Sequence, residues 1–128
     1  MNRNWGMKNE IEKCNEWHEK AMLLSDKAFD FERKGSRLQA REFYSQAFDF
    51  EKKSALLLQE KYDVEPSRSV LFRSAAWLAF NAEEYRESER MAAYGLSGNT
   101  PEAVAAELRE VMQKAIAKIN ETQMANAA

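Results

Sequence analysis

The chain has 128 residues, of which 45% are hydrophobic and 31% are charged, and its formal net charge is −2. This length and composition are typical of one soluble globular domain with a single core. The nearly balanced charge argues against nucleic-acid binding, and no apolar run is long enough for a membrane span. The single cysteine excludes an internal disulfide, and the first residues lack the apolar centre of a secretory signal, so we expect a cytoplasmic protein.

The first two helices are predicted from apolar stripes. One stripe recurs at spacings of three and four residues, includes Cys14 as a small core residue, and stops at Gly35, a favourable helix C-cap. A second stripe follows Ser36, a good N-cap, and the segment "DVEP" ends it because the residue before a proline avoids the helical region. His18 lies among charged residues and is expected to face solvent.

Three further helices follow, and Pro66 suits the first turn of the third because the N–H that it lacks has no helical partner there. No alternation typical of strands persists for more than a few positions, so the fold class is predicted to be all-α, an antiparallel array in a single domain over residues 1–128. The predicted helices span residues 8–34, 36–62, 66–81, 83–96 and 101–121, with a frayed tail over residues 122–128.

The two helical hairpins within residues 21–101 share a pattern of small and aromatic residues. The first hairpin carries it at Ala28, Phe31, Gly35, Ala40, Tyr44 and Ala47, and the second at Phe72, Ala76, Ala79, Tyr85, Ser88, Ala92 and Gly95. This pattern resembles the tetratricopeptide repeat, a helix-turn-helix unit of 34 residues. Gly35 then corresponds to Glu83, so the second helix is longer than in the family and is expected to overhang its partner. Ile11 and Trp17, on an N-terminal extension of the first helix, are expected to contact this overhang. Lys27, Asp30 and the position of Pro101 also depart from the family pattern.

The resemblance implies a concave groove lined by the first helix of each hairpin, with the last helix covering the open end of the stack. The implied groove positions are Met22, Ser25, Asp26, Phe29 and Arg33 in the first hairpin, and Val70, Arg73, Ser74, Trp77 and Asn81 in the second. The packed face of the third helix is expected to hold Leu71, Phe72, Ala75, Ala76, Leu78 and Ala79. From the groove positions, the candidate partner-binding residues are Arg73, Trp77, Ser74, Asn81, Phe29, Arg33 and Asp26.

A structural role for the same residues is the alternative. Arginine and tryptophan are enriched at binding hot spots. Arg73 could instead pair with Glu51 or Glu32, and the last helix could cover Trp77. A peptide-carboxylate clamp like that of the family needs more basic residues than the groove positions supply.

The sequence gives no sign of an enzyme. One histidine and one cysteine are too few for a Cys/His zinc site, and His18 is the only candidate imidazole for a catalytic triad. Asn15 lies three residues before His18, so the Glu-x-x-His pair of a four-helix di-iron site is also absent. The glycines do not form a phosphate-binding loop, and the carboxylates of "EEYRESER" have ordinary arginine neighbours along a helix. We therefore expect no catalytic residues, no metal and no cofactor.

The predicted function is a non-enzymatic adaptor that binds a peptide or helix of another protein. One alternative is a self-associating bundle, a homodimer in which the segment "ALLLQEKY" is buried in a second copy. Another is a small enzyme or ligand carrier with a pocket between helices. A three-helix microtubule-interacting-and-transport-type module matches the first two helices but does not account for the fourth and fifth.

Overall fold

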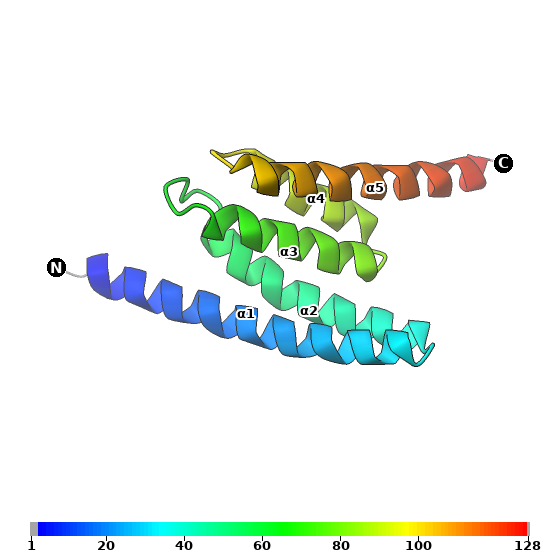
Figure 1. Ribbon diagram of the computed structural model, residues 1–128, viewed down its shortest axis with the longest axis horizontal. Helices are drawn as coiled ribbons and strands as arrows, with labels where there is room; N and C mark the ends of the chain where they lie inside the picture. The colour runs from blue at the N-terminus through cyan, green and yellow to red at the C-terminus, as the bar shows by residue number, and fades with distance from the viewer. Residues whose placement is uncertain (1–2, 128) are drawn as a thin grey trace.

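Five helices make up the computed structural model, which describes residues 3–127, with side chains described from residue 9 onward, and contains no strand in that range (Figure 1). Helix α1 packs on α2, α2 on α3, α3 on α4, and α5 on both α4 and α3. In Figure 1, α1, α3 and α5 form the layer nearer the viewer, and α2 and α4 lie behind them. The all-α antiparallel array is therefore confirmed, and it is compatible with a helical-repeat fold. The helices are α1 (Arg3–Arg33), α2 (Arg37–Leu57), α3 (Ser67–Asn81), α4 (Tyr85–Leu96) and α5 (Glu102–Ala127).

Three predicted helix bounds were wrong, and the first is the start of α1, which lies at Arg3 rather than at residue 8. Helix α2 ends at Leu57 rather than Tyr62, and turns follow it. The physical reason is a tertiary contact, because the Gln59 carbonyl accepts a hydrogen bond from Nε of Arg68 at 2.8 Å instead of one from a helical N–H. The tail predicted to fray continues α5 to Ala127, since its alanine, glutamine and glutamate residues favour a helix without packing.

The first helix of each hairpin ends with the same backbone turn. Gly35 and Glu83 both adopt the left-handed conformation, with φ of 79° and 64°. In both turns the next residue donates its backbone N–H to a carbonyl in the last helical turn at 2.9 Å, which satisfies a carbonyl left open by the helix end. This shared geometry agrees with the correspondence between Gly35 and Glu83 that the sequence pattern predicts.

Glu83 is a glutamate at a position that favours glycine, so we expect Glu83→Gly to be more stable than Glu83→Ala by about 1 kcal/mol. Both variants lose the exposed ion pair between Glu83 and Arg41, whose atoms lie 2.9 Å apart, so their difference isolates the backbone conformation. Urea unfolding followed by circular dichroism measures this difference. Equal stability of the two variants would contradict the assignment of strain to this residue.

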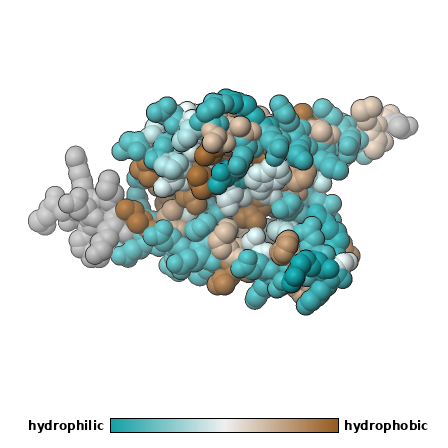
Figure 2. All heavy atoms as spheres, viewed as in Figure 1, coloured by the Kyte–Doolittle hydropathy of each residue, from teal (hydrophilic) through white to brown (hydrophobic). Residues whose placement is uncertain are grey.

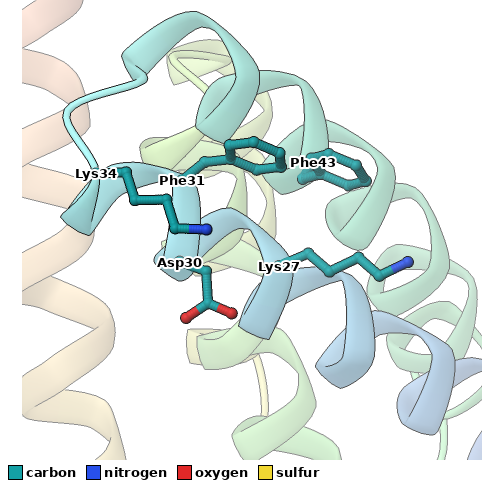
Figure 3. Close-up of a pocket in the computed structure, with 5 residues that line it drawn as sticks. All are labelled: Lys27, Asp30, Phe31, Lys34 and Phe43. Atoms are coloured by element: carbon teal, nitrogen blue, oxygen red, sulfur yellow. The ribbon is translucent and has the colours of Figure 1, made fainter.

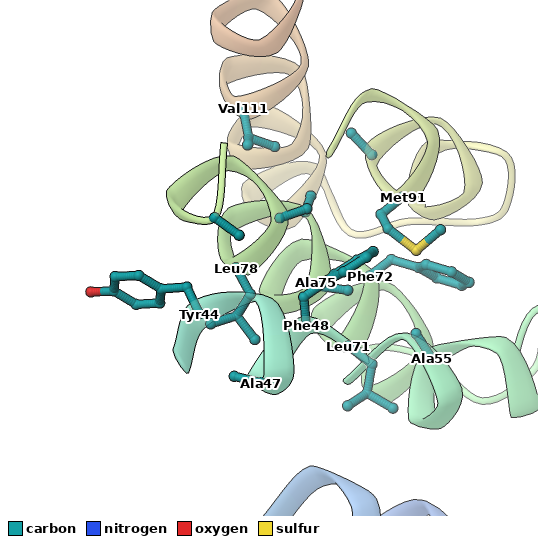
Figure 4. Packing of buried hydrophobic residues seen from close by; sticks show 14 of the residues in the cluster. Tyr44, Ala47, Phe48, Ala55, Leu71, Phe72, Ala75, Leu78, Met91 and Val111 are labelled. Carbon is teal, nitrogen blue, oxygen red and sulfur yellow. The ribbon is translucent and has the colours of Figure 1, made fainter. Parts of the chain in front are cut away.

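The core surrounds α3, and Figure 4 shows side chains from α2, α3, α4 and α5 meeting there. The predicted packed face of α3 is confirmed, because all six of its residues are buried. Cys14 is also buried, as predicted, and its carbonyl accepts a hydrogen bond from the Ser54 hydroxyl at 2.8 Å. Among the described residues, no helix combines the length and apolar character needed to cross a membrane.

The extra length of α2 packs along the N-terminal part of α1, and the expected overhang is absent. Lys61 lies 2.9 Å from Glu10, and the Lys53 ammonium lies 6.0 Å from the ring centre of the half-buried Trp17. The expected contact of Trp17 with this part of α2 is confirmed. Ile11, in contrast, remains 54% exposed.

Arg68 is a charged residue in the core, with no solvent exposure. It donates to the Gln59 carbonyl and, at 2.7 Å, to the Tyr94 carbonyl. Its guanidinium lies 4.8 Å from the ring centre of Tyr62 and 5.2 Å from that of Phe72. Arg68 therefore connects the α2–α3 turn, α3 and the end of α4.

Candidate binding groove

A groove lies between α1 and α3 because α1 packs on α2 rather than on α3. Figure 2 shows brown and white atoms gathered in the band between the teal surfaces of the lower and upper helices. One pocket in this groove has a volume of about 420 Å³. Its lining residues, which are mostly apolar, are Ile11, Cys14, Asn15, His18, Leu58, Val64, Ser67, Val70 and Leu71.

The groove positions predicted on α3 have the expected exposure. Each of them is partly accessible, whereas the alanines on the opposite face are fully buried. Trp77 packs edge-on against Phe80, with ring centres 5.9 Å apart, and α5 does not cover it completely. The accessible positions are Val70, Arg73, Ser74, Trp77 and Asn81.

The predicted partners of Arg73 were wrong. Its Nη1 lies 3.0 Å from Oε2 of Glu107 on α5, because position 73 lies on the side of α3 that faces α5. Glu32 instead accepts a hydrogen bond from the Tyr44 hydroxyl at 2.7 Å. Arg73 remains partly exposed, so the ion pair forms one wall of the surface beside the groove.

The groove positions predicted on α1 divide into two groups. Met22 and Ser25 are half-buried, whereas Asp26 and Phe29 are exposed. Arg33, also exposed, lies at the end of the helix. Its guanidinium is 5.6 Å from the Phe29 ring centre, and its Nη2 is 3.0 Å from an Asp30 oxygen. The contacts of Arg33 are thus with neighbouring residues at the tip of the α1–α2 hairpin.

A polar cluster of Glu51, His18 and Ser74 supports the groove, and sequence reasoning missed it. Glu51 is fully buried and accepts hydrogen bonds from the Ser74 hydroxyl at 2.5 Å and from Nδ1 of His18 at 2.9 Å. The predicted solvent exposure of His18 holds only in part, because its side chain is 42% exposed while its Nδ1 is bonded to the buried Glu51. The signal was a carboxylate in the apolar stripe of α2, at helical spacing from Tyr44 and Ala47.

This cluster does not form a nucleophile. In a serine hydrolase triad the histidine lies between the serine and the carboxylate, whereas here Glu51 lies between Ser74 and His18. Among residues 9–127, no group of three or more histidine, cysteine, aspartate or glutamate side chains is placed to hold a metal ion. The cluster therefore fixes the positions of α1, α2 and α3 around the groove.

We expect Glu51→Gln to change the pH dependence of stability. Burial raises the pKa of the Glu51 carboxyl, and hydrogen bonds from Ser74 and His18 together with the charge of His18 oppose that rise. A raised pKa in the folded state means that this group stabilises the fold at low pH and that the contribution is lost as the pH rises above 4.5. The unfolding free energy of the wild type should therefore fall, relative to the variant, between acid and neutral pH.

Urea unfolding at several pH values measures this difference, and the exposed Glu19→Gln provides the control. A glutamine at position 51 can still accept the serine hydrogen bond, so the variant should fold. Parallel pH profiles for the wild type and Glu51→Gln would contradict a raised pKa.

A second depression lies at the tip of the α1–α2 hairpin (Figure 3). The rings of Phe31 and Phe43 stack there with centres 5.4 Å apart, and the Lys27 ammonium lies 5.9 Å from the Phe43 ring centre. Asp30 and Lys34 complete the lining. Lys27 and Asp30, which depart from the repeat pattern, thus belong to this tip and lie away from the groove side of α1.

Comparisons of the chain with protein-family models, with curated proteins and with solved structures give no match.

Proposed function

We propose that the protein is a non-enzymatic binding module whose groove between α1 and α3 holds a peptide or helix of another protein. We propose further that its hairpins are diverged tetratricopeptide-like units, with α5 as the closing helix. The observation that carries the proposal is a mostly apolar pocket between α1 and α3, with the partly exposed Trp77 farther along the face of α3 that holds the lining residue Val70, because apolar surface of this kind is typical of binding sites. The identity of the partner as another protein and the cytoplasmic location of this protein stay predictions.

The surroundings of Trp77 support a binding role. The central groove residues of α3, Val70, Ser74 and Trp77, carry no charge, so a partner could cover them without desolvating an ion. They lie on a helix whose opposite face is fully packed, and the buried Glu51 is bonded to one of them. A rigid, preformed surface of this kind loses little entropy when a partner binds.

Self-association receives less support from the segment "ALLLQEKY". Leu58 is buried within the chain, and Tyr62 stacks on the Arg68 guanidinium of the same chain. Part of this segment is thus already used in folding, and its exposed apolar residues are Leu56 and Tyr62. We favour a different protein as the partner.

Site-specific photo-crosslinking tests the proposal. p-Benzoylphenylalanine would replace Trp77 in the groove and, as the control, the exposed Ala93 on α4. After irradiation in a lysate of cells that express the protein, we expect adducts with another protein from position 77 and not from position 93. Adducts that contain only a second copy of the chain would favour self-association, and equal labelling from both positions would contradict a groove-specific partner.

A further inference from the structure

We infer that the partner segment has two features, an inference that rests on the proposed function. It carries an aliphatic side chain that fills the groove between Ile11 and Val70. It also carries a lysine or arginine that lies against Glu19 and Asp26. The two features of the partner follow from two neighbouring parts of the groove. The aliphatic residue is the anchor, and the basic residue sets the direction of the segment along α1.

The anchor part of the groove is apolar and open at one side. Ile11 is 54% exposed and Val64 is 37% exposed, and both line the depression, while the buried Leu58 and Leu71 lie at its base. The volume of about 420 Å³ is large enough for one or two aliphatic side chains. Among the described residues that line this pocket there is no lysine, arginine, aspartate or glutamate. A charged side chain of the partner would therefore find no ion-pair partner in the pocket.

The neighbouring part of the groove is acidic. Glu19 and Asp26 line a shallow depression together with His18, Met22 and Leu23. Both carboxylates are exposed, and none of the ion pairs found among residues 9–127 involves either of them. A cation on the partner would therefore meet carboxylates that are not already paired.

The nearby cations of the protein are engaged elsewhere. Arg73 pairs with Glu107, Arg33 stacks on Phe29, and Lys27 lies over Phe43 on the other side of the hairpin. None of these three cations is therefore paired with Glu19 or Asp26. Charge complementarity favours a basic partner segment and disfavours an acidic one.

The distance between the two parts limits the spacing in the partner. His18 borders the anchor part, and Asp26 lies eight residues farther along α1, which is about 12 Å at the helical rise of 1.5 Å per residue. The basic residue should therefore lie about four residues from the anchor, before or after it, in an extended segment. In a helical segment the spacing is about two turns.

A displayed library of random 15-residue peptides tests this inference. The library would be selected on the wild-type protein, and the affinities of enriched peptides measured by fluorescence polarisation. We expect an aliphatic residue and at least one lysine or arginine at this spacing. Glu19→Lys/Asp26→Lys should weaken binding about tenfold, and Ile11→Asp or Val70→Asp at least as much. Glu42→Lys on α2, with the same charge change away from the groove, should leave affinity within about twofold.

The outcomes separate the inference from the proposed function. Enriched peptides that lose affinity in Ile11→Asp but carry no basic residue, or bind the Glu19→Lys/Asp26→Lys variant equally well, would overturn the inference and leave the groove function standing. Enriched peptides that respond to Trp77→Ala but not to Ile11→Asp or Val70→Asp would also overturn the inference, and if no enriched peptide responds to any of these three variants, the proposed function itself fails. Circular dichroism checks that each variant is folded, and the exposed position of Ile11 keeps that variant informative if Val70→Asp unfolds.

Discussion

Replacing Arg68 with methionine is expected to lower the unfolding free energy by about 3–5 kcal/mol. The guanidinium is completely buried and donates to the Gln59 and Tyr94 carbonyls at 2.8 and 2.7 Å. Methionine fills much of the same space but donates no hydrogen bond, so the Gln59 carbonyl loses the bond from Arg68, whereas the Tyr94 carbonyl still accepts from the Ser97 hydroxyl. An unsatisfied buried carbonyl costs about 1–3 kcal/mol, and the contacts of the guanidinium with Glu65 and with the Tyr62 ring are lost as well.

Arg68→Lys tests whether geometry or charge matters at this position. A lysine keeps the positive charge but cannot reproduce the planar fork that reaches two carbonyls on different segments. We expect it to recover less than half of the lost stability. The site is tightly shaped around the guanidinium, because a Cβ added at Gly98 would lie 2.9 Å from Nη1 of Arg68.

Arg73→Met is the matched control on the same helix. Arg73 is half-buried and pairs with the exposed Glu107, so its removal should cost less than about 1 kcal/mol. Urea unfolding followed by circular dichroism compares the three variants with the wild type. Similar losses for Arg68→Met and Arg73→Met would contradict the central role of the buried arginine.

Enlarging Ala76 is expected to have the second large effect. Ala76 is fully buried where α3 faces α4, and its carbonyl accepts a hydrogen bond from the buried Ser88 hydroxyl at 2.8 Å. A leucine at this position would force the helices apart, and such overpacking costs about 1–3 kcal/mol. The measurement is the midpoint of urea unfolding. Ala106→Leu, at an exposed position of α5, should leave stability nearly unchanged.

Trp77→Ala distinguishes the two faces of α3. Because Trp77 is partly exposed, we expect a loss of about 1–2 kcal/mol, below the ~3–5 kcal/mol typical of a tryptophan in the core. A core-like loss for Trp77→Ala together with a neutral Ala76→Leu would reverse the assignment of the faces. The groove would then lose its aromatic residue.

The sequence by itself determined the number of helices, the all-α class and the face of α3 that enters the core. These features depend on the periodicity of apolar residues along one segment, which the sequence displays directly. The turn at Gly35 was also predictable, since a glycine after an apolar stripe favours the left-handed conformation. The same conformation at Glu83 was not predicted, because glutamate does not favour it, although the repeat pattern aligns this residue with Gly35.

Only the tertiary structure decided which polar groups meet. Arg68 lies in the core, Glu51 is bonded to His18, and Arg73 pairs with Glu107, and each partner comes from a different segment. The burial of a charged residue depends on whether distant groups supply its hydrogen bonds, and one helix does not carry that information. The early end of α2 has the same cause, because the Gln59 carbonyl, just after the helix, accepts a hydrogen bond from Arg68 of α3.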